Sequence, residues 1–162
     1  MAFTSFAETK GSKEYQLKAA YLLNFARFVY WPEAAFTHTA EKFNICVYGE
    51  NPFGDSLDRL SSKKIHNRKI HIIYTDNSEK IVACHIVYVG KSKKSTYAEE
   101  LKEHKNSILL SVSDIGDFSL NGGMIEFIRV KKKIKFIINV NESMDAGIKY
   151  RSQLLEVAEK LR

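Results

Sequence analysis

Apolar side chains recur along the first part of the chain with the period of a helix. Leu17, Tyr21, Phe25 and Phe28 follow one another at intervals of three to four residues, which predicts a helix over 13–30. Apolar residues also fill much of the opposite face of this helix. We therefore expect it to be covered on more than one side, by a sheet of the same chain and by a second copy or a partner protein.

The predicted helix ends in a group of aromatic residues. Pro32 has no backbone N–H and disfavours a helical conformation at Trp31, so the helix should stop there. Large aromatic side chains are typical of protein cores and also of protein interfaces. Two interpretations stay open: these residues are all core, or they form a partner-binding or dimer surface, for which the candidates are Phe25, Phe28, Tyr30 and Trp31.

Short apolar runs bounded by turn residues predict four strands, at 43–48, 70–74, 84–89 and 107–112. Between them we expect a helix over 52–60 capped by Asn51, a helical turn over 78–83 and an amphipathic helix over 96–104. Three of the four strands are apolar on both faces, which is typical of a sheet covered by helices on each side. Alternation of strands with helices indicates that the strands are parallel.

The end of the chain has a different pattern. Two β-rich runs, 124–130 and 134–140, are joined by three lysines and predict an antiparallel hairpin with a lysine tip. A short helix capped by Asn141 or Ser143 should end at Gly147, and Ser152 should cap a last helix to Leu161. The predicted fold class is α/β: a single-domain three-layer sandwich with a mostly parallel sheet, a C-terminal antiparallel hairpin and helices on both faces.

Length and charge set limits on this picture. With 162 residues the chain is long enough for one domain, which we place at 13–162, with residues 1–12 as a disordered or vector-derived segment. The net charge is +6, but the densest basic runs, 91–94 and 131–133, hold only three lysines each. Scattered charge of this kind is typical of solvated loops and does not predict nucleic-acid binding, although attraction to an acidic partner or an anionic membrane surface remains open.

No motif in the sequence predicts an enzyme. The histidines form no HExxH spacing, and neither GxSxG nor GxGxxG occurs. Gly90-Lys91-Ser92 resembles the end of a phosphate loop, but His85 stands where that loop needs a glycine. Successive strand residues point to opposite faces, so Cys84 and His85 should not contact each other. We expect no catalytic residues, no cofactor and no metal site.

One candidate ligand site follows from the topology. In an open parallel sheet, ligands bind at the carboxyl ends of the strands, and these ends are polar here. The candidate residues are Glu50, Asn51, Lys91, Ser92 and Asp114. Ordinary loop composition also explains the same residues and is the interpretation we prefer from the sequence.

The two cysteines lie in strands that are adjacent in the commonest small doubly wound order. Cys46 is inside the first predicted strand and Cys84 begins the third, so a disulfide between them is geometrically reasonable. Two buried thiols are equally compatible with the composition.

Four segments together resemble the YfiR family. They are KAAYLLNFARFVYWP, FNICVYG, ACHIVYVG and NGGMIEFIRVKKKIKFIINVNESMDAGIKYRSQLLEVA. The last is the most specific, through Gly122, Gly123, Phe136, Asn139, Gly147 and Leu154–Leu155. The resemblance covers nearly the whole chain.

The resemblance implies a protein exported to the periplasm, with a signal peptide outside these 162 residues, and a disulfide between Cys46 and Cys84. It implies a non-enzymatic repressor that binds the periplasmic part of a membrane-bound diguanylate cyclase and so lowers cyclic di-GMP and biofilm formation. We expect it to be a homodimer. Some relatives accompany sensor kinases, and the alternative is a periplasmic sensor that binds a small envelope-derived ligand and acts on such a kinase. Better-known members carry a second cysteine pair that this chain lacks, so any redox sensing must use Cys46 and Cys84.

Overall fold

A computed structural model describes the backbone of residues 2–36 and 42–162, and the side chains from Ser12 onward apart from 37–41. The described residues form an eight-stranded sheet with the order β10-β8-β7-β6-β5-β2-β4-β3. Its strands are β2 (Lys42–Tyr48), β3 (Lys64–Ile65), β4 (Arg68–Thr75), β5 (Ile86–Val89), β6 (Leu110–Ser113), β7 (Ile125–Val130), β8 (Lys133–Ile138) and β10 (Lys160–Leu161). A separate antiparallel pair joins β1 (Val29–Tyr30) to β9 (Lys149–Tyr150).

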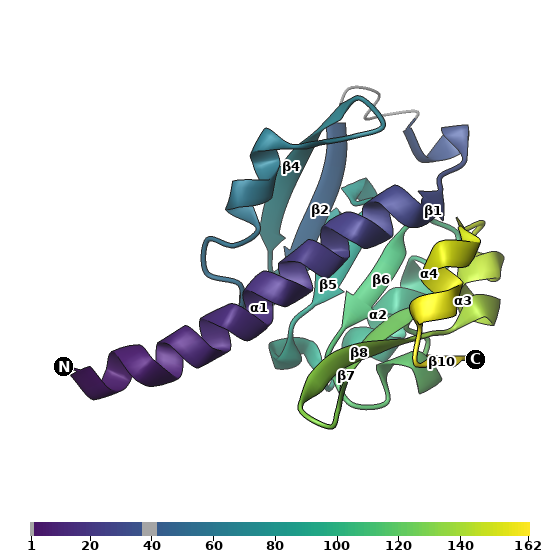
Figure 1. The fold of residues 1–162 in the computed structure, drawn as a ribbon. Coiled ribbons are helices and arrows are strands. Elements are labelled where there is room, and N and C mark those ends of the chain that lie inside the picture. Colours follow the sequence, from purple (N-terminus) through teal and green to yellow (C-terminus); the bar gives the residue numbers. More distant parts are fainter. Residues whose placement is uncertain (1, 37–41) are drawn as a thin grey trace.

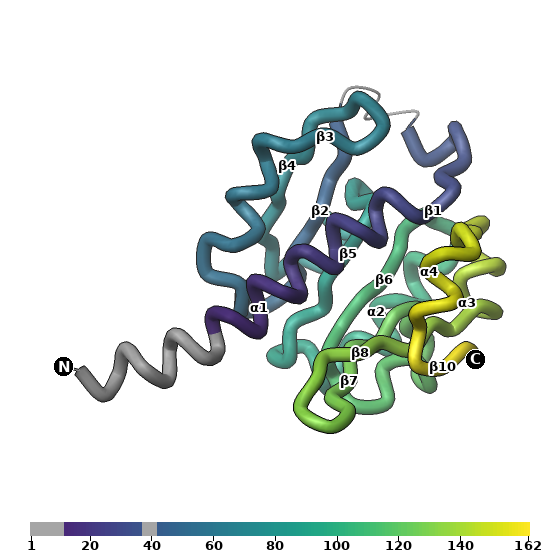
Figure 2. The backbone as a smooth tube through the Cα atoms, in the orientation of Figure 1, coloured from purple at the N-terminus to yellow at the C-terminus, as the bar shows by residue number. Residues whose placement is uncertain are grey.

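Helices cover both faces of this sheet, as Figure 1 shows. The helices are α1 (Ala2–Phe28), α2 (Tyr97–Glu103), α3 (Val140–Asp145) and α4 (Ser152–Val157). Short 3-10 helices are η1 (Glu33–Phe36), η2 (Asp58–Ser62), η3 (Ser78–Ala83), η4 (Lys91–Lys93) and η5 (Phe118–Leu120). The long helix α1 crosses one face diagonally, with α4 beside its C-terminal part, and α2 lies behind the sheet (Figures 1 and 2). The predicted α/β sandwich with helices on both faces is confirmed.

Alternation of apolar residues along the central strands explains the two covered faces. In β2, Ile45 and Val47 belong to the cluster that α1 covers, whereas Cys46 and Tyr48 belong to the cluster on the opposite face. All four side chains are buried. A strand buried on both faces loses the polar half of the usual alternation, which is why the sequence showed a continuous apolar run.

The parallel part of the sheet comprises β4, β2, β5, β6 and β7, and β10 adds parallel to β8. The predicted hairpin is confirmed: β7 and β8 are antiparallel, with Val130 paired to Lys133. The sequence left the position of the hairpin undecided, and the structure places it beside β6, as a continuation of the sheet. Asn121 and Gly122 form a turn shortly before it.

The prediction of a helix over 52–60 was wrong. The Asn51 side chain, expected to cap a helix, instead accepts a hydrogen bond from the Phe53 N–H at 2.9 Å and closes a tight turn. Gly54 then adopts a left-handed conformation, with φ of +58°. Asn is suited to such turns as well as to helix caps, and here the turn excludes the helix until η2.

Helix boundaries also differ from prediction at three places. The chain leaves α1 at Phe28 because Val29 and Tyr30 pair with β9. Helix α3 is capped by Asn139, whose side chain accepts from the Glu142 N–H at 3.0 Å, and not by Asn141 or Ser143. The last helix stops at Val157, since residues 160–161 pair with β8.

The prediction for residues 1–12 falls largely outside the described side chains and stays a prediction. No helix in the described part of the chain is long and apolar enough to cross a membrane.

Candidate functional site

The loops after β2, β5 and β6 carry the predicted ligand-site residues, and the structure brings four of the five together in pairs. The Ser92 hydroxyl accepts a hydrogen bond from the Glu50 N–H at 2.9 Å, and Lys91 Nζ lies 4.0 Å from Asp114 Oδ2. Asn51 is instead occupied by its own turn. Lys91 and Asp114 are therefore the pair that can act jointly on a ligand.

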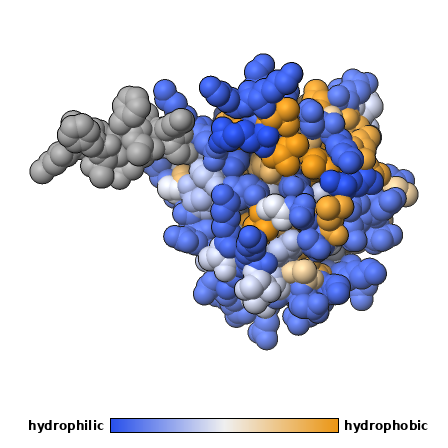
Figure 3. All heavy atoms as spheres, turned by 90° about the horizontal axis from the view of Figure 1, so that it is seen from below, coloured by the Kyte–Doolittle hydropathy of each residue, from blue (hydrophilic) through white to orange (hydrophobic). Residues whose placement is uncertain are grey.

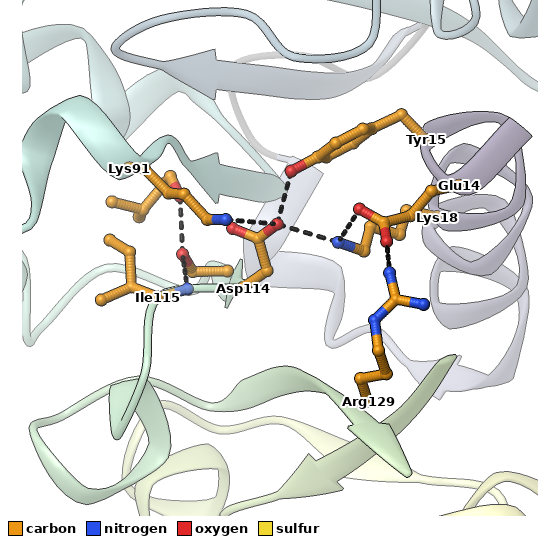
Figure 4. A network of polar contacts seen from close by, with 9 residues as sticks. Glu14, Tyr15, Lys18, Lys91, Asp114, Ile115 and Arg129 are labelled. Carbon is orange, nitrogen blue, oxygen red and sulfur yellow. Dashed lines mark hydrogen bonds and ion pairs between the residues drawn. The ribbon is translucent and has the colours of Figure 1, made fainter. Parts of the chain in front are cut away.

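Asp114 is the centre of a polar network that α1 completes (Figure 4). Its side chain is only 6% exposed, and Oδ2 accepts hydrogen bonds from Lys18 Nζ at 2.8 Å and from the Tyr15 hydroxyl at 2.5 Å. Tyr15 and Lys18 are three residues apart on one face of α1, so both reach the same carboxylate. The buried charge is thus paired and hydrogen-bonded, as a charge inside a protein needs to be.

A second carboxylate extends this network toward the hairpin. Glu14 pairs with Lys18 at 3.3 Å and also with Arg129 of β7 (Figure 4). The chain of contacts therefore joins the end of β6, the helix α1 and the strand β7. We call Glu14, Tyr15, Lys18, Asp114 and Arg129 the Asp114 network.

Electrostatics keep Asp114 ionised. Burial alone would raise its pKa, but hydrogen bonds from Lys18 and Tyr15 and the charge of Lys18 outweigh burial and hold the pKa below the ordinary value. Burial and the hydrogen bond to Asp114 raise the pKa of Tyr15, which therefore stays a protonated donor. At neutral pH the site is a carboxylate fixed by one ammonium group and one hydroxyl.

Sequence reasoning found Asp114 but missed Glu14, Tyr15, Lys18 and Arg129. A signal was present, because Lys18 is on the helix face predicted to be buried, three residues after Tyr15 and four before Leu22. Lysine is rarely buried unless it is paired. Such a lysine demands an acidic partner, although the sequence does not say which one.

The aromatic end of α1 shows a different arrangement from the one predicted. Phe25 is fully buried and belongs to the core, which corrects its prediction as a contact residue. Phe28 and Trp31 are partly buried, and Trp31 Nε1 donates to the Ala26 carbonyl at 2.9 Å. Only Tyr30 is widely exposed, at 52%.

Tyr30 lies in a surface groove with other aromatic and basic residues. The Arg151 guanidinium lies 4.4 Å from the Tyr30 ring centre, and Arg68 lies 3.7 Å from that of Phe36. The groove is completed by Trp31. We call Tyr30, Trp31, Phe36, Arg68 and Arg151 the aromatic corner; Tyr30 is exposed, Phe36 is buried and the other three are partly exposed. Aromatic and arginine side chains are enriched at protein interfaces.

The Cys46–Cys84 disulfide implied by the family resemblance is confirmed. The two Cα atoms are 5.9 Å apart, and both side chains are buried on the face opposite α1. The bond ties β2 to the segment that leads into β5, so the two strands are neighbours as predicted.

His85 has a structural role. Its Nδ1 accepts a hydrogen bond from the Asn44 N–H at 2.9 Å, and its Nε2 lies 2.9 Å from the Ala35 carbonyl. Burial lowers the pKa of His85, which favours the neutral ring. Within the described residues, no three His, Cys, Asp or Glu side chains are grouped so that they could hold a metal ion.

Comparison with known proteins identifies a family. A family model described as YfiR/HmsC-like matches residues 15–159. No curated protein matches the sequence.

Two solved structures share the fold at low sequence identity. One is the ABC domain in complex with L-Trp from Streptococcus pneumoniae, with a TM-score of 0.52 and 8% identity. The other is a conserved domain protein from Vibrio cholerae, with a TM-score of 0.50 and 10% identity. In each case the match covers 80% of this chain and 58% of the other chain, so this chain spans little more than half their length. Identities this low show the fold alone.

Proposed function

The chain belongs to the YfiR/HmsC-like family, and on that premise we propose that it binds the periplasmic part of a membrane-bound diguanylate cyclase and represses it without catalysing a reaction. Membership of this family supports, in general terms, a periplasmic regulator of diguanylate cyclase. Repression lowers cyclic di-GMP and, with it, biofilm formation. Direct binding to the cyclase requires an exposed surface on the molecule that can form an interface.

The aromatic corner is the observation that supports such a surface. Tyr30 is 52% exposed, although β1–β9 pairing fixes its backbone and Arg151 packs on its ring. A rigid aromatic side chain held in place before binding loses little conformational entropy when a partner covers it. The corner therefore has both the residue types and the preorganisation of an interface centre.

Repression by binding requires a difference in affinity between two states of the target. A regulator that binds the inactive state of the cyclase about 3 kcal/mol more tightly than the active state shifts the population about 100-fold. No chemical step is required.

Replacing Tyr30 with alanine should weaken binding to the periplasmic part of the cyclase about 30-fold, the effect of losing an interface hot spot. Tyr74→Ala is the matched control, because Tyr74 is also exposed, at 42%, and its hydroxyl is bound by Asp58. The measurement is titration calorimetry on purified proteins, with cellular cyclic di-GMP as the second readout. Equal affinities for the two variants would contradict the assignment of the surface.

We also propose that the protein is a homodimer. Sedimentation equilibrium of the wild type and of Tyr30→Ala tests this point and shows whether the aromatic corner holds the two copies together. A monomer at all concentrations would refute the dimer. A dimer that survives the substitution would place its interface elsewhere and leave the aromatic corner available to the cyclase.

The second candidate function is a small-ligand sensor acting on a sensor kinase. The supporting observation is a cavity of about 180 Å³ beside the Asp114 network, whose lining includes Lys91, Asp114, Glu14 and Arg129 and so presents both signs of charge. Groups of both signs suit a small zwitterionic ligand.

Calorimetric titration with amino acids and peptidoglycan fragments tests the sensor function. Lys91→Ala should weaken the binding of such a ligand, because Lys91 is exposed and faces Asp114. The same substitution should leave binding to the cyclase unchanged. If no compound of these classes binds the wild type, the sensor function is rejected and the repressor function is unaffected.

A further inference from the structure

The tip of the β7–β8 hairpin departs from the usual chemistry of its turn. Lys131 and Lys132 form a two-residue turn with φ of +49° and +68°. Turns with two left-handed residues strongly favour Asn-Gly, because other side chains meet steric strain in that conformation. Two lysines are therefore placed where folding alone would favour other residues, and such local departures are typical of functional positions.

Positive charge accumulates around this tip. A groove between α1 and the hairpin is lined by Lys13, Arg129, Lys132, Lys133 and Lys135, with Glu14 as its acidic residue. Glu14 is already paired with Lys18 and Arg129. Among the described residues, no acidic side chain forms an ion pair with Lys131, Lys132, Lys133 or Lys135.

Hydrophobic side chains accompany these charges. Leu17 of α1 also lines the groove and is 45% exposed, and Tyr21 and Ile134 lie partly buried beside it. The view from below, the side on which the hairpin lies, shows a mostly hydrophilic surface with islands of hydrophobic side chains (Figure 3). Lysines around a limited apolar contact are suited to the boundary between water and lipid.

We propose that the hairpin tip (Lys131–Lys133), together with the turn of α1 that lines the same groove (Lys13–Leu17), docks on an anionic phospholipid surface. Lysine is a compact, strongly hydrated charge without the planar fork that arginine offers to a carboxylate, so a lysine cluster favours diffuse attraction over stereospecific pairing. The one arginine of the groove is held by Glu14. The hairpin lies at an extremity of the fold, so its lysines can approach an extended surface together (Figure 1). This docking does not depend on the proposed repression.

The test uses vesicles of three parts phosphatidylcholine to one part phosphatidylglycerol, and vesicles of phosphatidylcholine alone. We expect the whole chain to co-sediment with the anionic vesicles only, and the binding to weaken as salt is added. Each lysine near an anionic surface contributes about fivefold to the binding constant, so the Lys131→Gln, Lys132→Gln, Lys133→Gln triple variant should bind about 100-fold more weakly.

A triple variant with the same change in net charge is the control. Lys63→Gln, Lys64→Gln and Lys69→Gln remove three exposed lysines at the opposite edge of the sheet, around β3 and β4. This variant should bind the anionic vesicles like the wild type. Equal loss in the two triple variants would show that only net charge matters and would overturn the proposal.

A further variant separates the charge of the tip from its role in folding. Lys131→Asn with Lys132→Gly supplies the favoured turn residues, so it should raise the melting temperature while weakening vesicle binding about 25-fold. A lower melting temperature would show that Lys131 and Lys132 stabilise the turn. It would contradict the claim that they are strained there.

Absence of vesicle binding by the wild type at low salt would refute docking on lipid. Polyglutamate immobilised on a column is the second probe. Retention of the wild type on that column, without vesicle binding and with loss of retention in the tip variant, would assign the surface to an acidic polypeptide instead.

Discussion

Reduction of the Cys46–Cys84 disulfide should lower the free energy of unfolding by about 4 kcal/mol. The two residues are 38 positions apart in sequence, and the bond restricts the unfolded chain by closing this loop. Urea denaturation of the oxidised and the reduced protein measures the difference without any change of sequence. A difference below about 1 kcal/mol would mean that the reduced, unfolded chain keeps the two segments together by other means.

Two controls accompany this measurement. The intact mass without reductant should be lower by two hydrogens than the mass after reduction. The Cys46→Ala, Cys84→Ala double variant should be less stable than the oxidised wild type. Its free energy of unfolding should be the same in oxidant and in reductant, because it has no disulfide to break. Two thiols that react with an alkylating agent in the native, oxidised protein would contradict the disulfide.

Burial of the disulfide also limits its use as a redox switch. Both cysteines are within the core cluster on the face opposite α1, so a reductant reaches the sulfur atoms only when this part of the molecule opens. The chain has no other cysteine. We therefore expect any redox response to appear as a loss of stability rather than as exchange at the surface.

The sequence predicted the central layers of the fold well, because burial on both faces leaves a clear signal. The helical turn over 78–83, the helix near 96–104 and the hairpin were each found where the structure has them. These elements depend on local patterns of apolar and turn residues. The one long-range pairing inferred from the usual order of parallel strands, between β2 and β5, is confirmed, whereas the position of the hairpin in the sheet was left undecided.

Elements that depend on a distant partner were not predictable in the same way. The pair β1–β9 has two residues in each strand, too few to show any periodicity, and it exists because residues 119 and 121 positions apart meet. The same holds for β10, which replaces the last turn of a predicted helix. In both places tertiary pairing overrides a local helical preference.

The candidate site could be predicted only in part, because some of its contacts also join distant segments of the chain. Asp114 and Lys91 follow strands and were visible as polar strand ends, whereas Tyr15 and Lys18 reach Asp114 across 99 and 96 positions of sequence. No local pattern specifies such a pairing. The sequence did not distinguish the exposed Tyr30 from the buried Phe25, because both lie in the same aromatic segment; the structure separates them.

The Asp114 network makes the stability of the protein depend on Lys18. Replacing Lys18 with methionine keeps the length of the side chain but removes the buried cation of Asp114 and leaves it only the exposed Lys91, 4.0 Å away, which should cost about 3 kcal/mol of stability at neutral pH. Lys13→Met is the matched control: Lys13 is exposed on the same helix, so its loss should change stability by less than about 0.5 kcal/mol. Urea denaturation of the three proteins gives both values.

As the pH falls, the contribution of Asp114 to the free energy of unfolding should change in opposite directions in the wild type and in Lys18→Met. In the wild type the pKa of Asp114 lies below its unfolded value, so the stabilisation is complete above about pH 4 and is lost as the pH falls through the folded pKa. In Lys18→Met burial still raises the pKa of Asp114, and only the Tyr15 hydrogen bond and the exposed Lys91 oppose it, so we expect the pKa to lie above its unfolded value. The deficit of the variant should then be full at neutral pH and shrink as the pH falls toward 4, because protonation removes the unpaired charge. A deficit that stays constant over this range would show that Lys18 acts through packing alone and that its charge does not hold Asp114.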